Sequence, residues 1–135
     1  MFYTNQDTMK KIGILLVIAL LTLSCSHDEG YGGLATIRGK VFGKDYNSSG
    51  NVVGQGYVGG FKVYISKHGE PNYFDSKDSA PDGSFKFDYL YEGKYDIWVY
   101  GDCDYCAWDQ VYVLKTIEIT SKKQTVETED FVVSF

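Results

Sequence analysis

Residues 81–100 read P-D-G-S-F-K-F-D-Y-L-Y-E-G-K-Y-D-I-W-V-Y and contain two segments in which apolar and polar side chains alternate. A turn precedes each segment, Asp82-Gly83 before the first and Glu92-Gly93 before the second. The apolar side chains that share a face are Phe85 and Phe87, then Tyr95, Ile97 and Val99. A period of two that is bounded by turn residues is typical of a half-buried β-hairpin, which we therefore predict here.

The rest of the chain extends this pattern. Further strands are predicted at residues 34–44, 61–66, 72–77, 110–120 and 124–135. Residues 45–60 are rich in glycine and break the alternation, which predicts a mobile loop, with a functional loop as the alternative. The sum is about seven strands with frequent turns, the spacing of a β-sandwich. We expect an all-β domain over residues 34–135, built as a seven-stranded antiparallel β-sandwich of the Ig-like or transthyretin-like kind.

Composition supports a single small domain and argues against nucleic acid as a partner. The chain has 135 residues, 16% aromatic content and a formal net charge of −5. Phosphate backbones are bound by clustered lysine and arginine, and an acidic chain without such clusters does not offer them.

The N-terminus carries the pattern of an export signal. Lys10 and Lys11 precede an apolar run of 12 residues from Ile12 to Leu23, which is too short to span a membrane as a helix. We predict a signal peptide over residues 1–24, with Met9 as an alternative start.

Leu21-Thr22-Leu23-Ser24-Cys25 resembles the lipobox of bacterial lipoproteins, although Thr22 departs from the usual leucine. The resemblance implies that Cys25 carries lipid and that residues 25–33 form a flexible tether on the outer membrane. Ser26-His27-Asp28-Glu29-Gly30 is similar to an acidic signal that sends some lipoproteins to the cell exterior. The alternative to lipidation is ordinary cleavage after Ser26, which leaves no anchor. The alternatives to export to the cell exterior are an acidic tether without a sorting role and a periplasmic location.

Four motifs together resemble the carboxypeptidase regulatory-like family. They are G-K-V-F at 39–42, F-K-V-Y-I at 61–65, D-G-S-F-K-F at 82–87 and E-G-K-Y-D-I-W-V at 92–99. The resemblance implies a sandwich similar to transthyretin, in which Gly93 and Tyr95 stand for the family's glycine and its packed tyrosine. It also implies a non-catalytic spacer or binding module.

Cys103 and Cys106 form a C-x-x-C motif in a loop between strands. An oxidising compartment, and the even number of cysteines that remains once Cys25 is acylated, favour a disulfide. A redox-active motif normally opens a helix, and no helical period surrounds this one. Redox function and metal binding remain the alternatives.

Aromatic side chains lie on the outer face of the second predicted segment. Trp98 and Tyr100 point away from the expected core, and Tyr105, Trp108 and Tyr112 follow. Outward aromatics can stack on sugar rings or form a protein interface. Alternatively, the loop that carries Cys103 simply covers Trp98.

Asp78-Ser79-Ala80 resembles a short O-glycosylation signal of exported bacterial proteins, which makes Ser79 a candidate for modification.

Catalysis is not expected, because His27 and His68 are the only histidines and no nucleophile has a recognisable base. We expect no catalytic residue, cofactor or metal. Two sets of aspartates are alternative Ca²⁺ ligands, although neither has EF-hand spacing. One set is Asp75, Asp78 and Asp82, and the other is Asp102, Asp104 and Asp109. The expected function is a lipid-anchored, surface-exposed module that binds or assembles with an envelope protein. The alternative is a glycan-binding accessory lipoprotein, and the remote one is a thiol-disulfide redox protein.

Overall fold

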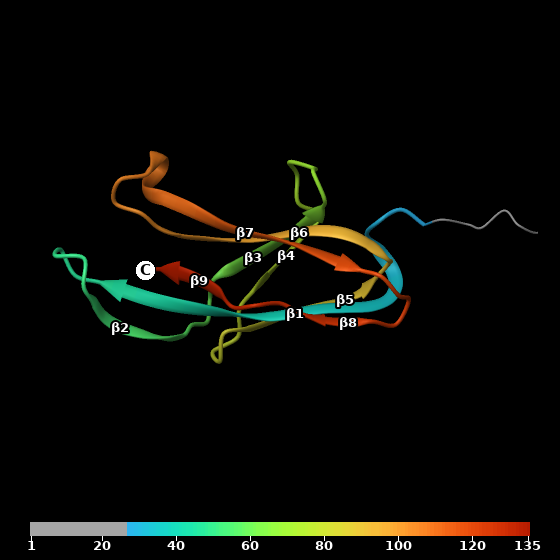
Figure 1. Cartoon of the computed structure of the whole chain (residues 1–135), viewed down its shortest axis with the longest axis horizontal. Helices are drawn as coiled ribbons and strands as arrows, with labels where there is room; N and C mark the ends of the chain where they lie inside the picture. Colours follow the sequence, from blue (N-terminus) through green and yellow to red (C-terminus); the bar gives the residue numbers. More distant parts are fainter. Residues whose placement is uncertain (1–26) are drawn as a thin grey trace, which may run out of the picture.

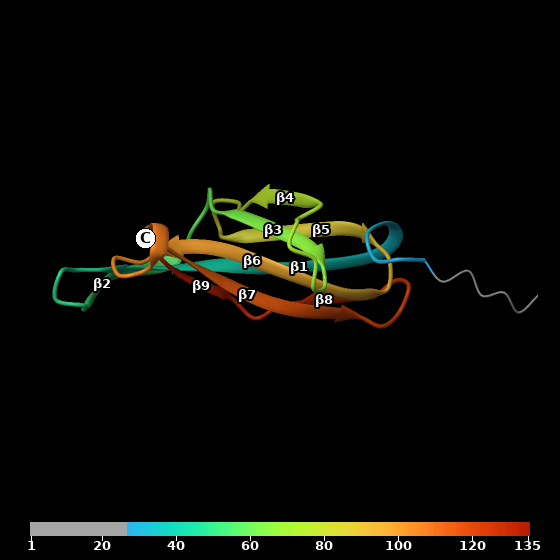
Figure 2. The ribbon, with the colours of Figure 1, turned by 90° about the horizontal axis from the view of Figure 1, so that it is seen from above.

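The computed structural model describes residues 27–135, which form two β-sheets packed face to face (Figures 1 and 2). A short 3₁₀ helix, η1 (Ala107–Asp109), precedes β7. The strands of this part of the chain are β1 (Tyr31–Tyr46), β2 (Val52–Tyr57), β3 (Lys62–Lys67), β4 (Asp75–Asp78), β5 (Ser84–Leu90), β6 (Gly93–Asp102), β7 (Gln110–Ile119), β8 (Thr125–Glu127) and β9 (Phe131–Ser134).

One sheet is built around β1, and the other has the order β4-β3-β6-β7. β1 pairs antiparallel with β2 and β5 and parallel with β8 and β9. The predicted all-β sandwich is confirmed, but the described residues hold nine strands rather than seven and the β1 sheet is mixed. The difference has two sources. β2 forms within residues 45–60, and residues 124–135 break at 128–130 into two short strands that both run beside β1.

The predicted hairpin at residues 81–100 is wrong. Its two strands both form, but β5 pairs with β1 whereas β6 pairs with β3 and β7. Two backbone departures bracket the connection, since Tyr89 has φ 62° and Gly93 has φ 143°. The apolar faces of β5 and β6 therefore meet across the core instead of lying side by side in one sheet.

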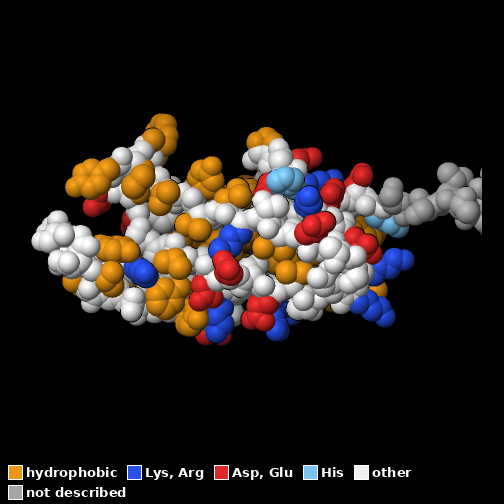
Figure 3. Space-filling view, in the orientation of Figure 1, with side chains coloured by type: hydrophobic (Ala, Val, Ile, Leu, Met, Phe, Trp, Pro, Cys, Tyr) orange, Lys and Arg blue, Asp and Glu red, His pale blue; other side chains and the backbone are white. Residues whose placement is uncertain are grey.

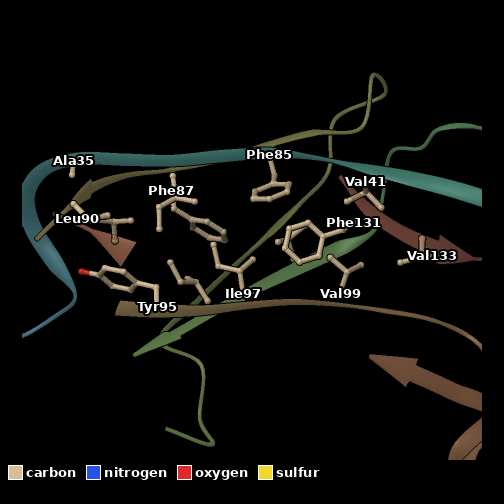
Figure 4. Close-up of a cluster of buried hydrophobic side chains, with 14 residues drawn as sticks. Ala35, Val41, Phe85, Phe87, Leu90, Tyr95, Ile97, Val99, Phe131 and Val133 are labelled. Carbon is tan, nitrogen blue, oxygen red and sulfur yellow. The ribbon is translucent and has the colours of Figure 1, made fainter. Parts of the chain in front are cut away.

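The core lies between the sheets, as Figure 4 shows. Each apolar side chain predicted to share the inner face of β5 and β6 is buried there. The other buried apolar side chains come mainly from β1, β3 and β9: Ala35, Ile37, Val41, Val63, Ile65, Leu90, Ile119, Phe131 and Val133.

The glycine-rich segment is not a structureless loop, which corrects the prediction for residues 45–60. β2 forms inside it and pairs with the extended end of β1, from Phe42 opposite Tyr57 to Tyr46 opposite Val52. Glycine weakens strand preference, so the sequence hides this strand, but β1 continues to Tyr46 and offers it a hydrogen-bonding edge.

Gly93 and Tyr95 fix the start of the domain. The buried Tyr95 hydroxyl donates to the Tyr91 carbonyl oxygen at 2.8 Å and accepts from the Gly30 amide at 2.8 Å. A side chain at position 93 would collide with Glu29. These contacts tie residues 29–30 to the corner between β5 and β6, a form of the tyrosine corner known from other sandwiches.

The predicted signal peptide and Cys25 lie outside the described residues. Over residues 27–135, the structure contains no helix with the length and apolar character that a membrane crossing requires.

Candidate functional site

The outer face of the β4-β3-β6-β7 sheet carries ordered rows of side chains. One row runs from Tyr64 on β3 through Trp98 on β6 to Leu114 on β7. Tyr100 stands opposite Tyr112 in the next row. This confirms that Trp98 and Tyr100 point away from the core, because their neighbours Ile97 and Val99 are buried inside it. Directly opposed side chains on one sheet face are in contact range, so each row forms a continuous surface.

The aromatic rings of these rows pack on one another. We call Tyr64, Tyr73, Trp98, Tyr100 and Tyr112 the aromatic face. Tyr64 is stacked on Trp98, with ring centroids 5.5 Å apart and an interplanar angle of 12°. Edge-on contacts join Tyr64 to Tyr73 at 4.9 Å, Tyr64 to Tyr100 at 5.8 Å, and Tyr100 to Tyr112 at 6.4 Å. Mutual packing holds these rings in place before any ligand arrives.

A groove of about 220 Å³ follows this face. Its apolar lining comes from Trp98, Tyr100, Tyr112 and Leu114. The polar lining comes from Glu70 beside Pro71, and from Ser66 and Asp96. Apolar rings combined with a few polar groups are the mixture that small-molecule sites commonly present.

Asp96 lines the groove and holds three neighbouring residues by hydrogen bonds. It is 8% exposed, and its carboxylate accepts from the Gly69 amide at 2.9 Å and the Thr116 hydroxyl at 2.7 Å. His68 Nδ1 lies 2.9 Å from the same carboxylate. Burial by itself raises the pKa of Asp96, but the hydrogen bonds from Gly69, His68 and Thr116 outweigh it and leave the pKa lowered. Asp96 is therefore a charged anchor for the β3–β4 turn.

Ser66, His68 and Asp96 are near one another without forming a nucleophilic triad. Ser66 stands opposite Asp96 across the two strands and is fully buried. Its hydroxyl makes no hydrogen bond to any described residue, and His68 is bound to Asp96 instead. The hydrogen bond from nucleophile to base that characterises such a triad is therefore not formed by these three residues.

The loop between β6 and β7 carries the predicted disulfide. Cys103 and Cys106 are joined, with their Cα atoms 5.4 Å apart. Tyr105 and Trp108 stand on this loop and are 99% and 93% exposed. Neither lines the groove, so the structure brings Trp98 and Tyr100 together and leaves Tyr105 and Trp108 apart from them.

The alternative that the Cys103 loop covers Trp98 is not what the structure contains, since Tyr64 of β3 stacks on that ring instead.

Apolar side chains also gather at the end of the molecule where the β6–β7 and β1–β2 turns lie (Figure 3).

Ser79 occupies a poor position for modification of the folded chain. It is 5% exposed, and its hydroxyl donates to the Val58 carbonyl oxygen at 2.8 Å and accepts from the Phe61 amide at 3.1 Å. A glycan on this oxygen would replace the proton that the hydroxyl donates to Val58. Over residues 27–135, no three acidic, histidine or cysteine side chains gather as metal ligands, so neither aspartate set forms a cluster there.

Sequence reasoning missed part of the site. It did not identify Tyr64 and Tyr73 of the aromatic face, nor Leu114 and Glu70 of its groove. A signal for Tyr64 was present, because it alternates with the core residues Val63 and Ile65 and must point outward.

Comparisons with known proteins yield a likeness of fold only. No family model matches the chain, and no curated protein matches it in sequence. Among solved structures, the chain is similar to the crystal structure of a "putative carbohydrate binding protein" from Pseudomonas aeruginosa. The TM-score is 0.44 and the sequence identity 13%, with 78% of this chain and 91% of that chain covered. A likeness of this degree carries no argument about function.

Proposed function

We propose that this protein is a non-catalytic carbohydrate-binding module whose groove on the aromatic face holds a sugar. The observation that supports the proposal is the pairing, in one groove, of packed aromatic rings with the exposed carboxylate of Glu70. A pyranose has an apolar C–H face that packs on aromatic rings and a rim of hydroxyl groups that hydrogen-bond to oxygen acceptors. The groove offers partners for both parts.

The charge of the groove favours a neutral sugar. Its ionisable lining residues are Glu70 and Asp96, with no lysine or arginine among the lining side chains. Carboxylates accept hydrogen bonds from sugar hydroxyls and repel anionic groups. We therefore expect neutral glycans to bind here in preference to acidic ones.

A role without catalysis is consistent with how the polar groups are used. The Asp96 carboxylate holds His68, Gly69 and Thr116, so its lone pairs are committed to the fold. A general acid or base needs a free position toward the substrate, which this carboxylate does not offer.

A lipid anchor and a relationship to a known domain family complete the proposal. We infer from Ser24-Cys25 that the domain is tethered by lipid to the outer membrane, facing the cell exterior. Mass spectrometry of the mature N-terminus tests this, because an unmodified chain that begins after Cys25 would contradict it. The Gly93–Tyr95 corner supports the proposed relationship to carboxypeptidase regulatory-like domains.

Retention on immobilised neutral polysaccharides tests the glycan proposal. We expect native affinity electrophoresis in cellulose derivatives, xylan, mannan and β-glucan to reveal slowed migration on at least one. Trp98→Ala should lower the affinity by roughly tenfold, the effect of losing one ring contact of one to two kcal/mol. Trp108→Ala is the matched control, because it removes the same ring from outside the groove.

A second variant protects the test from a folding defect. Tyr100→Ala truncates a partly exposed ring of the groove, and circular dichroism establishes that the variant is folded. If no polysaccharide retains the protein, or if the Trp98 and Trp108 variants are retained equally, the glycan proposal fails. Assembly with an envelope protein would then be the better hypothesis.

A further inference from the structure

A second groove lies on the other sheet, at its edge. It encloses about 580 Å³ between β1 and β5 on one side and β4 on the other. Four cationic side chains line it, Arg38, Lys40, Lys77 and Lys86, together with the carboxylates of Asp78 and Glu127. We call it the basic groove. A concentration of positive charge is unexpected in a chain with a formal net charge of −5.

The two carboxylates of the basic groove already have cationic partners. Glu127 lies 3.1 Å from Arg38, and Asp78 lies 3.3 Å from Lys62. Lys86 is paired with Asp88 at 3.0 Å. The charges of these residues therefore cancel in pairs, and the excess positive charge comes from the remaining two lysines.

Lys40 and Lys77 lie over aromatic rings, while Asp82 attracts Lys40 and Asp88 attracts Lys77 without forming an ion pair. The Lys40 ammonium lies 4.6 Å from the centre of the Tyr57 ring, and that of Lys77 lies 5.6 Å from the centre of the Phe87 ring. Within residues 27–135, neither makes an ion pair. A cation–π contact orients an ammonium group without using its hydrogen-bond donors, so both remain able to bind an anion.

The register of the sheet gathers two further cations beside the groove. Arg38 and Lys86 are direct partners across β1 and β5. Their carboxylate partners Glu127 and Asp88 offset this like-charge contact, so the open positive charge of the groove is still that of Lys40 and Lys77.

We propose that the basic groove binds the carboxylate of an acidic oligosaccharide. Its volume exceeds what a bare ion fills and suits a ligand of a few sugar rings. A uronic acid presents a carboxylate that the cationic side chains can bind and hydroxyl groups that the other polar lining residues can meet. This site is separate from the neutral-sugar groove on the aromatic face, since the two share no lining residue.

Calorimetric titration with tri-galacturonate tests the proposal, and its methyl ester provides the neutral match. We expect binding of the acid that weakens as salt rises, and no comparable binding of the ester. The double variant Lys40→Gln/Lys77→Gln should lose roughly tenfold or more in affinity, because two charge-assisted contacts disappear. Lys122→Gln/Lys123→Gln removes the same charge from an exposed turn and should bind as the parent does.

Two additional experiments distinguish sugar binding from a folding defect and from binding of phosphate or lipid. Lys40→Arg/Lys77→Arg keeps both charges and should retain binding, which distinguishes anion recognition from a loss of folding. Vesicles of anionic phospholipid and inorganic phosphate should not compete with tri-galacturonate. Binding of the ester as tight as that of the acid, equal losses in the two lysine-to-glutamine variants, or preferential binding to vesicles would overturn the proposal. Trp98→Ala should leave this titration unchanged, so the two glycan sites are tested separately.

Discussion

Replacing Tyr95 with phenylalanine removes one oxygen atom from the corner where the chain enters the domain. The ring stays in the core, so the variant creates no large cavity. The change leaves the Gly30 amide and the Tyr91 carbonyl without the partner that each has at 2.8 Å.

The expected cost follows from these two hydrogen bonds. Each contributes about 1 kcal/mol net to stability, so Tyr95→Phe should lower the free energy of unfolding by about 2 kcal/mol. In a domain of this size that loss corresponds to a fall in Tm of roughly 8 °C. A local effect is expected as well, because the Gly30 amide loses its acceptor and should exchange its hydrogen faster.

Urea denaturation measures the global effect and amide hydrogen exchange the local one. Tyr89→Phe is the matched control, since Tyr89 is 68% exposed and the same oxygen is removed at the other end of the turn. We expect Tyr89→Phe to unfold as the parent protein does. Equal midpoints for the two variants, with unchanged exchange at Gly30, would refute the reasoning that this corner holds the chain entry.

Acid should destabilise the domain through Asp96, because its pKa is lowered on folding from an ordinary value of 3.8. The stability that its charge contributes is complete above that value and is lost as the pH falls below it. Asp96→Asn should be less stable at neutral pH by roughly 1.5 to 3 kcal/mol and should show a shallower acid transition; parallel acid transitions would contradict this. Cys103→Ser/Cys106→Ser should cost only about 2 kcal/mol by loop-closure entropy and should leave retention on the Trp98 groove intact. A loss of retention in that folded variant would show that the disulfide loop shapes the site.

The alternation of side chains predicts the two inner faces of the sandwich, but not which strands pair. Phe85 and Tyr95 both read as inward, and both are buried. The same pattern fits a hairpin and an arch between sheets, because each places apolar residues on one face of each strand. The choice depends on tertiary partners, here β1 for β5 and β3 for β6, which lie far away in the sequence.

The candidate site shows the same limit. Trp98 and Tyr100 are identified as outward from their own strand, yet the ring that stacks on Trp98 is Tyr64, from β3. That contact is set by the register between β3 and β6, which local sequence does not encode. The basic groove is likewise assembled from β1, β4 and β5. Its cationic residues do not form a continuous basic segment, so the sequence alone does not predict it.

The central position of β1 has a mechanical consequence. β1 begins at Tyr31, at the end of the molecule opposite the β6–β7 turn (Figures 1 and 2). A force that pulls on the entering chain acts along β1, and so across its hydrogen bonds, which are perpendicular to the strand toward β2 and β5 and slanted toward β8 and β9. Those bonds must then shear together instead of opening one at a time. If the chain is tethered at its N-terminus and loaded through a bound polysaccharide, this topology should make the sandwich resist mechanical unfolding.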